Sequence, residues 1–304
     1  MLCCIWVRGG GSTEVDPESG GNVMLVSVTR RRLVGSAAGG LLVALCGARG
    51  ALAATTLGHH RMPTIRPTLP SRELFIPYTE RPIGNGGLAA GQVALTFDDG
   101  PHAGLTPLVL DTLKRYGVRA TFFVIGKNAA ANPDLVRRIL AEGHSVGTHS
   151  WSHPYLTSLG DEQARTEVVR AQDTVQGIDA GGLPFFRLPY GAGLRKPALL
   201  KTLTDLGLYN FYWNMDPNES STATPAVLLG RCLAEVRRAR GGTLLLHDTH
   251  RGTVGMLPDL LEAFMRLAVE TVVYRVPPSC PAPPTMVSAP KGEKTSPGGP
   301  ISRA

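Results

Sequence analysis

The fold is decided by residues 93–101, VALTFDDGP. The first five form a short apolar run of the kind that favours a buried strand. Two adjacent carboxylates, Asp98 and Asp99, follow at once, and Gly100-Pro101 marks a turn. Neighbouring side chains on a strand point to opposite faces, but a turn at the end of the strand can aim both at one place. Taken alone, such a pair is typical of a solvated turn, so its meaning depends on what the rest of the chain brings near it.

Outward from this stretch, short apolar runs alternate with longer segments of helical period. The sequence predicts further strands at 120–125, 145–148, 185–187, 209–213, 243–247 and 271–275, and helices around 108–117, 135–143, 161–176, 196–206, 225–240 and 257–268. Strands that alternate with helices in this way are typical of a parallel sheet. Because the segment is shorter than an ordinary eight-unit barrel, we expect an α/β fold, a distorted (β/α) barrel with about seven parallel strands.

Polar side chains follow the last apolar residues of several predicted strands. They are Asp98 and Asp99, His149 and His153, Arg187, Asp216 and His247. In a parallel barrel the C-terminal ends of the strands share one rim, so residues far apart in the sequence converge there. We therefore expect the active site at this rim.

The stretch HSWSH at 149–153 has the spacing of a metal site. Its two histidines stand at i and i+4, so one helical turn would place both imidazoles on the same face. Together with one carboxylate they form a two-histidine, one-carboxylate set, which leaves coordination positions open for water and substrate. A structural zinc site would use four closed ligands instead. The sequence thus indicates a catalytic divalent ion.

The ends of the 304-residue chain differ in composition from its middle. Residues 1–53 have the layout of a signal peptide, with Arg30–Arg32, an apolar stretch 33–46 and small residues at 51–54, where cleavage would fall near Ala53. The leader fits either twin-arginine or general secretory export, and Met24 is an alternative start. We interpret 54–90 as a linker and lead-in arm, 91–276 as the catalytic domain and 277–304 as a proline-rich disordered tail.

The formal net charge is +7, but the basic residues are scattered and form no stripe that would indicate nucleic-acid binding. Beyond the leader the sequence lacks an apolar run long enough to span a bilayer, so we expect no stable membrane span after signal cleavage. We expect an exported monomer, periplasmic or secreted. Cys232 and Cys280 are the cysteines that follow the leader, and in an oxidising compartment they either pair or remain thiols.

Five motifs, in order along the chain, resemble those of the polysaccharide deacetylases of the NodB homology type, carbohydrate esterase family four. They are TFDDGP at 96–101, ATFFV at 120–124, HSWSH at 149–153, RLPY at 187–190 and LLLHD at 244–248. The resemblance covers roughly residues 90–275, and five ordered motifs at five predicted strands are highly specific. It implies a NodB-type barrel and a metal-dependent hydrolase that acts on acetylated polysaccharides.

The resemblance also implies roles for the matched residues. It assigns the general base to Asp98, and to Arg187 the hydrogen bond that orients this base. It assigns the role of metal ligand to Asp99, His149 and His153, which would hold one divalent ion. We expect this ion to be Zn²⁺, with Co²⁺ and Mn²⁺ as alternatives.

The remaining matched positions carry the proton donor and its support. By the resemblance, His247 is the general acid and the main-chain N–H of Tyr190 is the oxyanion donor. One motif departs from the family, whose fourth block reads Asp-x-x-Asp-Trp, because residues 216–220 here read DPNES. Either Asp216 or Glu219 then supports His247. By position we favour Glu219 for the pairing and Asp216 for holding the loop, while Ser220 in place of tryptophan puts the substrate range in question.

These features predict a hydrolase that removes N-acetyl groups from an N-acetylglucosamine polymer and releases acetate. Peptidoglycan, a chitin-like polymer and an exopolysaccharide are the substrates considered. One alternative is an O-acetyl esterase of the same fold that acts on xylan-like chains. Another is a carbohydrate-binding relative without turnover, which would be expected to lack a ligand or the acid, whereas this chain retains them all.

Overall fold

Eight parallel strands form one sheet in the computed structural model, which describes residues 68–219 and 223–278. The strands are β1 (Arg72–Phe75), β2 (Gln92–Asp98), β3 (Thr121–Val124), β4 (Ser145–Thr148), β5 (Phe185–Arg187), β6 (Tyr209–Phe211), β7 (Gly242–His247) and β8 (Glu270–Arg275). Their order is β1-β8-β2-β3-β4-β5-β6, and β7 pairs with β2 outside this path. Since every pairing is parallel, the C-terminal ends of the strands lie at one edge.

Strand β2 pairs with three others. Its first half lies beside β8, its end lies beside β3, and β7 runs along nearly its whole length. In this register Asp98 stands opposite His247. All residues of β2 after the first are buried, as expected for a strand that is covered on both faces. This buried strand therefore carries Asp98 to the rim, between Phe123 of β3 and His247 of β7.

Alternation along β2 decides which way Asp98 faces. Val93, Leu95 and Phe97 belong to a cluster that packs against the helices. Ala94 belongs to a second cluster, which is lined by residues of β3, β5, β6 and β8. Because side chains alternate between the two faces of a strand, Asp98 falls on the Ala94 side, above the apolar residues enclosed by the strands.

Isolated bridges connect the remaining parts of the sheet. Met215, which follows β6, pairs with Leu244 of β7, and Ile83, which precedes β2, pairs with Phe211 of β6. The expected α/β fold with parallel strands is confirmed. Strands β6 and β7, however, form no ladder with each other, and among the described residues one bridge, from Met215 after β6 to Leu244 of β7, connects them.

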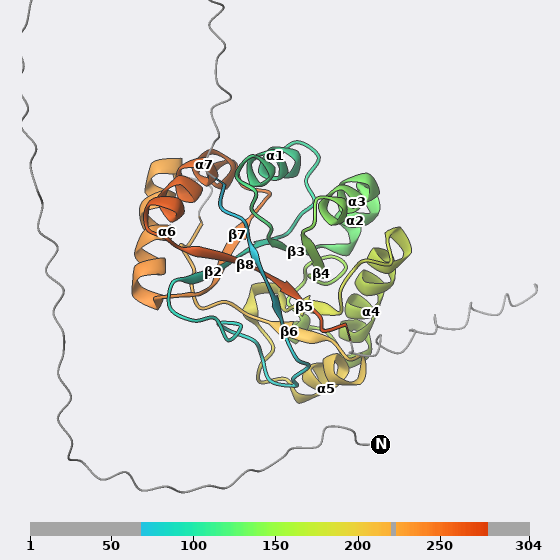
Figure 1. The fold of residues 1–304 in the computed structure, drawn as a ribbon. Helices are drawn as coiled ribbons and strands as arrows, with labels where there is room; N and C mark the ends of the chain where they lie inside the picture. The colour runs from blue at the N-terminus through green and yellow to red at the C-terminus, as the bar shows by residue number, and fades with distance from the viewer. Residues whose placement is uncertain (1–67, 220–222, 279–304) are drawn as a thin grey trace, which may run out of the picture. The chain divides into compact units, whose positions relative to one another are not determined.

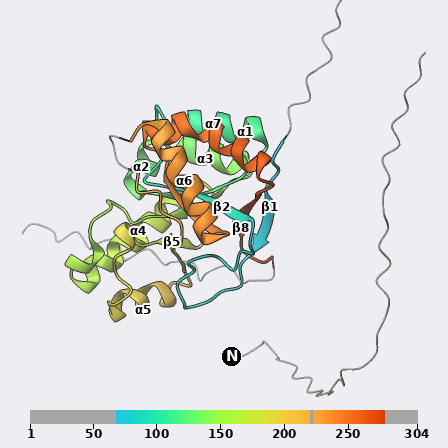
Figure 2. The same ribbon diagram turned by 90° about the vertical axis from the view of Figure 1, so that its left-hand side faces the viewer.

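The helices lie around the strands, with α6 and α7 on one side and α4 and α5 on the other (Figure 1). They are α1 (Thr106–Tyr116), α2 (Gly126–Ala131), α3 (Pro133–Ala141), α4 (Asp161–Ile178), α5 (Pro197–Asp205), α6 (Pro225–Ala239) and α7 (Arg251–Arg266). Proline stands in the first turn of α1, α3, α5 and α6, where its missing N–H has no intrahelical partner to lose. Helix α1 is capped by Gly117, whose φ of 71° suits a residue without a Cβ. Helix α7 packs between α1 and α6 (Figure 2).

The predicted strands are all present, with ends that differ by at most two residues. The sequence-based prediction missed β1, which lies in the segment 54–90 that we interpreted as a linker and lead-in arm. Its four residues are mostly exposed and pair with β8, so no apolar alternation marks them as a strand. Helix α7 begins at Arg251 and not near 257, and Pro258 lies inside it.

Several predictions fall on residues that the structure does not describe. These are the signal peptide 1–53, the linker up to residue 67, Ser220, Cys280 and the tail from 279 onward. Cys232 is described and is buried in the cluster between the sheet and the helices. Among the described residues, no helix combines the length and the apolar character needed to cross a bilayer.

Candidate active site

Asp98 and Arg187 form a buried ion pair at the ends of β2 and β5. Arg187 Nη1 donates to Asp98 Oδ1 at 2.6 Å and to Thr96 Oγ1 at 2.9 Å, and its Nη2 donates to the Tyr212 carbonyl at 3.1 Å. The guanidinium also lies over the ring of Phe123, 4.1 Å from its centroid. Burial raises the pKa of Asp98, and the charge of Arg187 opposes that shift. The pair therefore holds one carboxylate in a fixed orientation away from bulk water.

This pair supports a prediction about stability. We expect Arg187→Met to lower the free energy of unfolding by about 3–5 kcal/mol, because the buried Asp98 carboxylate loses its charge partner. The double variant Arg187→Met, Asp98→Leu removes that carboxylate as well and should recover part of the loss. Chemical denaturation of the wild type and both variants measures the difference. A double variant as unstable as the single one, or less stable, would contradict this account.

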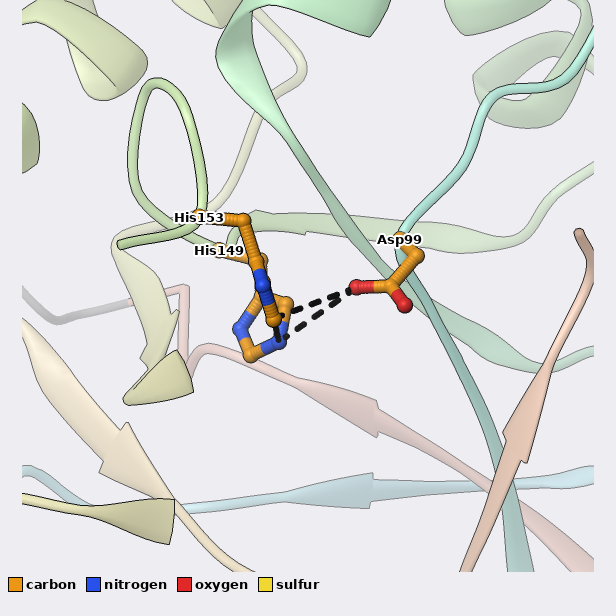
Figure 3. Close-up of side chains that lie close together, drawn as sticks. All are labelled: Asp99, His149 and His153. Carbon is orange, nitrogen blue, oxygen red and sulfur yellow. Dashed lines mark hydrogen bonds and ion pairs between the residues drawn. The ribbon is translucent and has the colours of Figure 1, made fainter. Parts of the chain in front are cut away.

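A second group of polar side chains converges beside the ion pair. Asp99 Oδ1 lies 3.4 Å from His153 Nε2 and 3.7 Å from His149 Nε2, and the rings of both histidines are turned toward the carboxylate (Figure 3). Asp99 and His153 both have a left-handed backbone, with φ of 74° and 61°. Non-glycine residues rarely adopt this conformation, so the surrounding structure must impose it. The two histidines are thus placed together by the loop after β4 and not by a helical turn.

The donor atoms of this group fit a divalent metal ion. His149 Nδ1 donates to the Arg187 carbonyl at 2.7 Å, which leaves a lone pair on Nε2. The two Nε2 atoms of His149 and His153 lie 3.2 Å apart, and Asp99 Oδ1 is buried without a hydrogen bond among the described residues. Burial lowers the pKa of His149 to about 3, so this ring is neutral at physiological pH. Two imidazole nitrogens and one carboxylate oxygen could therefore hold a divalent ion.

His247, at the end of β7, lies between this group and Glu219. Its Nε2 is 3.9 Å from Asp99 Oδ2, and its Nδ1 is hydrogen-bonded to Glu219 Oε2. The other oxygen of Glu219 accepts a hydrogen bond from the Thr253 hydroxyl. Burial acts to lower the pKa of His247, but the hydrogen bond to Glu219 and the nearby carboxylates raise it to about 9. The ring is therefore an imidazolium, with a proton on each nitrogen, at neutral pH.

Asp216 lies apart from this arrangement. Its Oδ1 accepts a hydrogen bond from the Asn218 N–H at 2.8 Å, and its own N–H donates to Glu235. The structure thus brings Glu219 to His247 and leaves Asp216 in the loop before it. Met215, at the start of this segment, pairs with Leu244 of β7, the strand that ends at His247.

Tyr190 lies on the rim beside the two histidines. Its backbone is left-handed, with φ of 59°, and its ring meets that of His153 edge-on at 4.5 Å. Tyr155 stacks on Tyr190 at 3.9 Å, and both rings are about half exposed. Trp213, which follows β6, lies close to Gly191. Aromatic surface therefore borders the site at the position of the RLPY motif.

Three residues near the site were not singled out from the sequence. His250 and Thr253 contact Glu219, and Tyr155 stacks on Tyr190. His250 follows the strand-end histidine by three residues, which is the spacing that could have drawn attention to it. Thr253 and Tyr155 carry no signal of this kind, because only the folded chain shows what they touch.

Residues 86–211 match the polysaccharide deacetylase family. The chain is 39% identical over 170 residues to the peptidoglycan-N-acetylglucosamine deacetylase PgdA of Listeria monocytogenes, covering 56% of this chain and 35% of that protein. It is 37% identical over 169 residues to the chitooligosaccharide deacetylase of Sinorhizobium fredii, covering 55% of this chain and 77% of that protein.

Among solved structures, the chain is similar to the peptidoglycan deacetylase Bd3279 of Bdellovibrio bacteriovorus. The TM-score is 0.64 at 28% identity, over 71% of this chain and 61% of that one. The chain spans only about a third of the Listeria protein, whereas it spans more than three quarters of the Sinorhizobium protein. The matched segment includes the Asp98, His149 and Arg187 motifs that form the site. The chain belongs to the polysaccharide deacetylase family.

Proposed function

We propose that this protein is a divalent-metal-dependent hydrolase that removes N-acetyl groups from an N-acetylglucosamine-containing polysaccharide. The observation that carries the proposal is the convergence of His149, His153 and Asp99 at the rim, with Asp98 on one side and His247 on the other. An amide needs an activated water, a place for the oxyanion and a proton for the leaving amine. This arrangement has a group for each of these tasks.

In the proposed mechanism Asp98 takes a proton from the attacking water. Its Oδ1 is held by Arg187, while its Oδ2 lies 3.6 Å from His149 Nε2 and so faces the ligand group. An ion held by Asp99, His149 and His153 would supply Lewis-acid activation of the acetyl carbonyl and of water. The hydrogen bond from Arg187 thus keeps Asp98 beside the metal ligands in an orientation suited to proton transfer.

His247 donates the second proton in this mechanism. Its Nε2 faces the ligand group through Asp99, and its Nδ1 is bound to Glu219, so the donated proton leaves from Nε2 toward the amine nitrogen. We assign the main-chain N–H of Tyr190 to the oxyanion. A preorganised donor of this kind contributes about 2.7–4 kcal/mol to the transition state in comparable sites.

The relatives support a cell-wall or chitin-like substrate. The Listeria protein is named for peptidoglycan N-acetylglucosamine, and the Sinorhizobium protein is named for chitooligosaccharides. We place peptidoglycan first, and with it an extracytoplasmic site of action that agrees with the leader expected at 1–53. An O-acetyl esterase of the same fold remains the second candidate. In that reaction the leaving group is an alkoxide, which needs less help from His247 than an amine does.

An acetate-release assay separates these functions. Purified full chain with Zn²⁺, Co²⁺ or Mn²⁺ should release acetate from N-acetylglucosamine oligomers and from peptidoglycan, and should leave acetylated xylan intact. Release from acetylated xylan alone would favour the esterase. Binding to these glycans without release from any of them would favour a non-catalytic relative.

The pairing of His247 with Glu219 predicts the pH profile. Since Glu219 raises the pKa of His247, the acid form is present below that pKa and is lost as the pH rises through about 9. We expect Glu219→Gln to move the alkaline limb of the rate profile to lower pH by about one unit or more, because a nearby negative charge favours the imidazolium. Asp216→Asn serves as the control, since Asp216 contacts Asn218 and Glu235 instead.

Rates of the wild type and both variants across pH 6–10 test this assignment. Glu219→Asp keeps the charge and should keep part of the shift. An alkaline limb that moves in Asp216→Asn and not in Glu219→Gln would reverse the assignment.

A further inference from the structure

A second cluster of metal-ligating groups lies on the far side of the His247 ring from Asp99. It consists of Glu219, His247 and His250, each of which offers one ligand atom within 4.8 Å of the others. Glu219 Oε2 is hydrogen-bonded to His247 Nδ1 and lies 3.5 Å from His250 Nδ1. The rings of the two histidines are 4.9 Å apart and tilted by 30°. Two imidazole nitrogens therefore converge on one carboxylate oxygen.

In the part of the chain that the structure describes, the cluster leaves one buried ring nitrogen without a hydrogen bond, although it lies within ion-pair distance of Glu219. His250 Nδ1 is buried and has no hydrogen-bond partner among the described residues, although its ring is about one-third exposed. The carboxylate of Glu219 is only 3% exposed, and its other oxygen is taken by Thr253. Within the described chain, the ion pairs of Glu219 are with these two imidazoles and with no lysine or arginine. A buried carboxylate whose balancing groups are two imidazoles is suited to a cation.

We propose that Glu219, His247 and His250 form a second divalent-cation site, with Zn²⁺ as the preferred ion. Two imidazole nitrogens and one carboxylate oxygen are a ligand set that zinc takes in proteins. Ligand bonds of about 2.0–2.2 Å in tetrahedral geometry place neighbouring donor atoms roughly 3.4 Å apart. The separation of Glu219 Oε2 and His250 Nδ1, 3.5 Å, is already close to this value. The contact of Glu219 with His247 must widen, because an ion replaces the proton between them.

Binding at this site exchanges a proton for a metal ion. The protonated His247 releases its Nδ1 proton to solvent, and the nitrogen lone pair forms the bond to the cation. The ring can then no longer exist as an imidazolium. If His247 is the proton donor of the proposed function, a cation at the second site inhibits turnover; this effect on activity rests on the proposed function, whereas the binding of the second ion does not. The first ion would thus activate the protein and the second would inhibit it.

The stoichiometry of zinc binding tests the site without any assay of activity. The full chain, carrying His59→Ala and His60→Ala to remove a histidine pair outside the described residues, is made metal-free and dialysed against Zn²⁺. Elemental analysis should find two ions per chain at saturation. It should find one ion in His250→Ala, and one ion in the double variant that carries both His149→Ala and His153→Ala. In His250→Ala we expect the affinity for the ion at the second site to fall at least about tenfold. Even removal of an outer-shell partner can cause a loss of this size.

Two further variants control for folding and for surface binding. His250→Gln retains a hydrogen-bond donor beside Glu219 and removes the imidazole, so it should also bind one ion. His102→Ala removes an exposed histidine outside both clusters and should still bind two. A single ion in the starting protein, or two ions in both His250 variants, overturns the proposal.

An activity assay separates this inference from the proposed function. Acetate release should rise with the first equivalent of Zn²⁺ and fall with excess, and the fall should disappear in His250→Gln. If the protein binds two ions but releases no acetate from any glycan, the second site is supported and the proposed function is rejected. Acetate release with one bound ion supports the function and rejects the site.

Discussion

Asp98→Asn is expected to lower turnover by roughly 10²–10⁴-fold, the range that a general base contributes, while the metal stays bound. The reason is the division of labour between two adjacent carboxylates. Asp99 Oδ1 lies within 3.7 Å of both histidine Nε2 atoms, whereas Asp98 Oδ1 is held at 2.6 Å by Arg187. Asparagine has a similar size and keeps an acceptor for Arg187, but it cannot take a proton from water.

Asp99→Asn is the matched variant, because it makes the same chemical change one residue further along. We expect it to lower the metal content together with turnover. Elemental analysis, acetate release and thermal unfolding of both variants separate loss of the base from loss of the ion and from loss of the fold. A metal-depleted Asp98 variant beside a fully loaded Asp99 variant would reverse the two roles.

Removal of the ion is expected to have an equally large effect. Chelation should reduce acetate release to background, and one equivalent of Zn²⁺, Co²⁺ or Mn²⁺ should restore it. In the absence of the ion neither the acetyl carbonyl nor the water is activated, and Asp98 alone is a weak base. His149→Ala and His153→Ala should each lower metal content and resist restoration, because three protein ligands are reduced to two.

The control for chelation is a histidine that lies outside the ligand group. His144→Ala changes a buried ring that accepts the Ala120 N–H at the opposite end of the sheet, and it should leave metal content unchanged. Full acetate release from a chelated sample that elemental analysis shows to be metal-free would falsify the metal-dependent mechanism.

Much of the fold was predictable from local pattern. Short buried runs that alternate with amphipathic helices specify a parallel sheet, and parallel strands place the residues after each run on one rim. Asp98 at the end of β2, His149 after β4, Arg187 in β5 and His247 in β7 meet for this reason. Strand β1 was not predictable, because four mostly exposed residues form a strand only beside β8.

Parts of the site depended on backbone geometry that no local pattern encodes. The spacing of His149 and His153 suggested a shared helical face, but the structure joins their nitrogens through a loop in which His153 has a positive φ. The positive φ of Asp99 likewise turns its carboxylate toward the histidines, while Asp98 continues the strand toward Arg187. These conformations are held by packing around the rim.

The sequence by itself determined the parallel α/β architecture, the family and the group of residues that gathers at the rim. It did so because strand and helix periods are local properties, and strands that alternate with helices pair in parallel with their C-terminal ends at one edge. Only the tertiary structure decided that Glu219 and not Asp216 meets His247, and that His250 lies on the same carboxylate. Which carboxylate meets His247 depends on the path of the chain after β6 and on the position of α7 beside it. Both depend on contacts between residues that are far apart in the sequence.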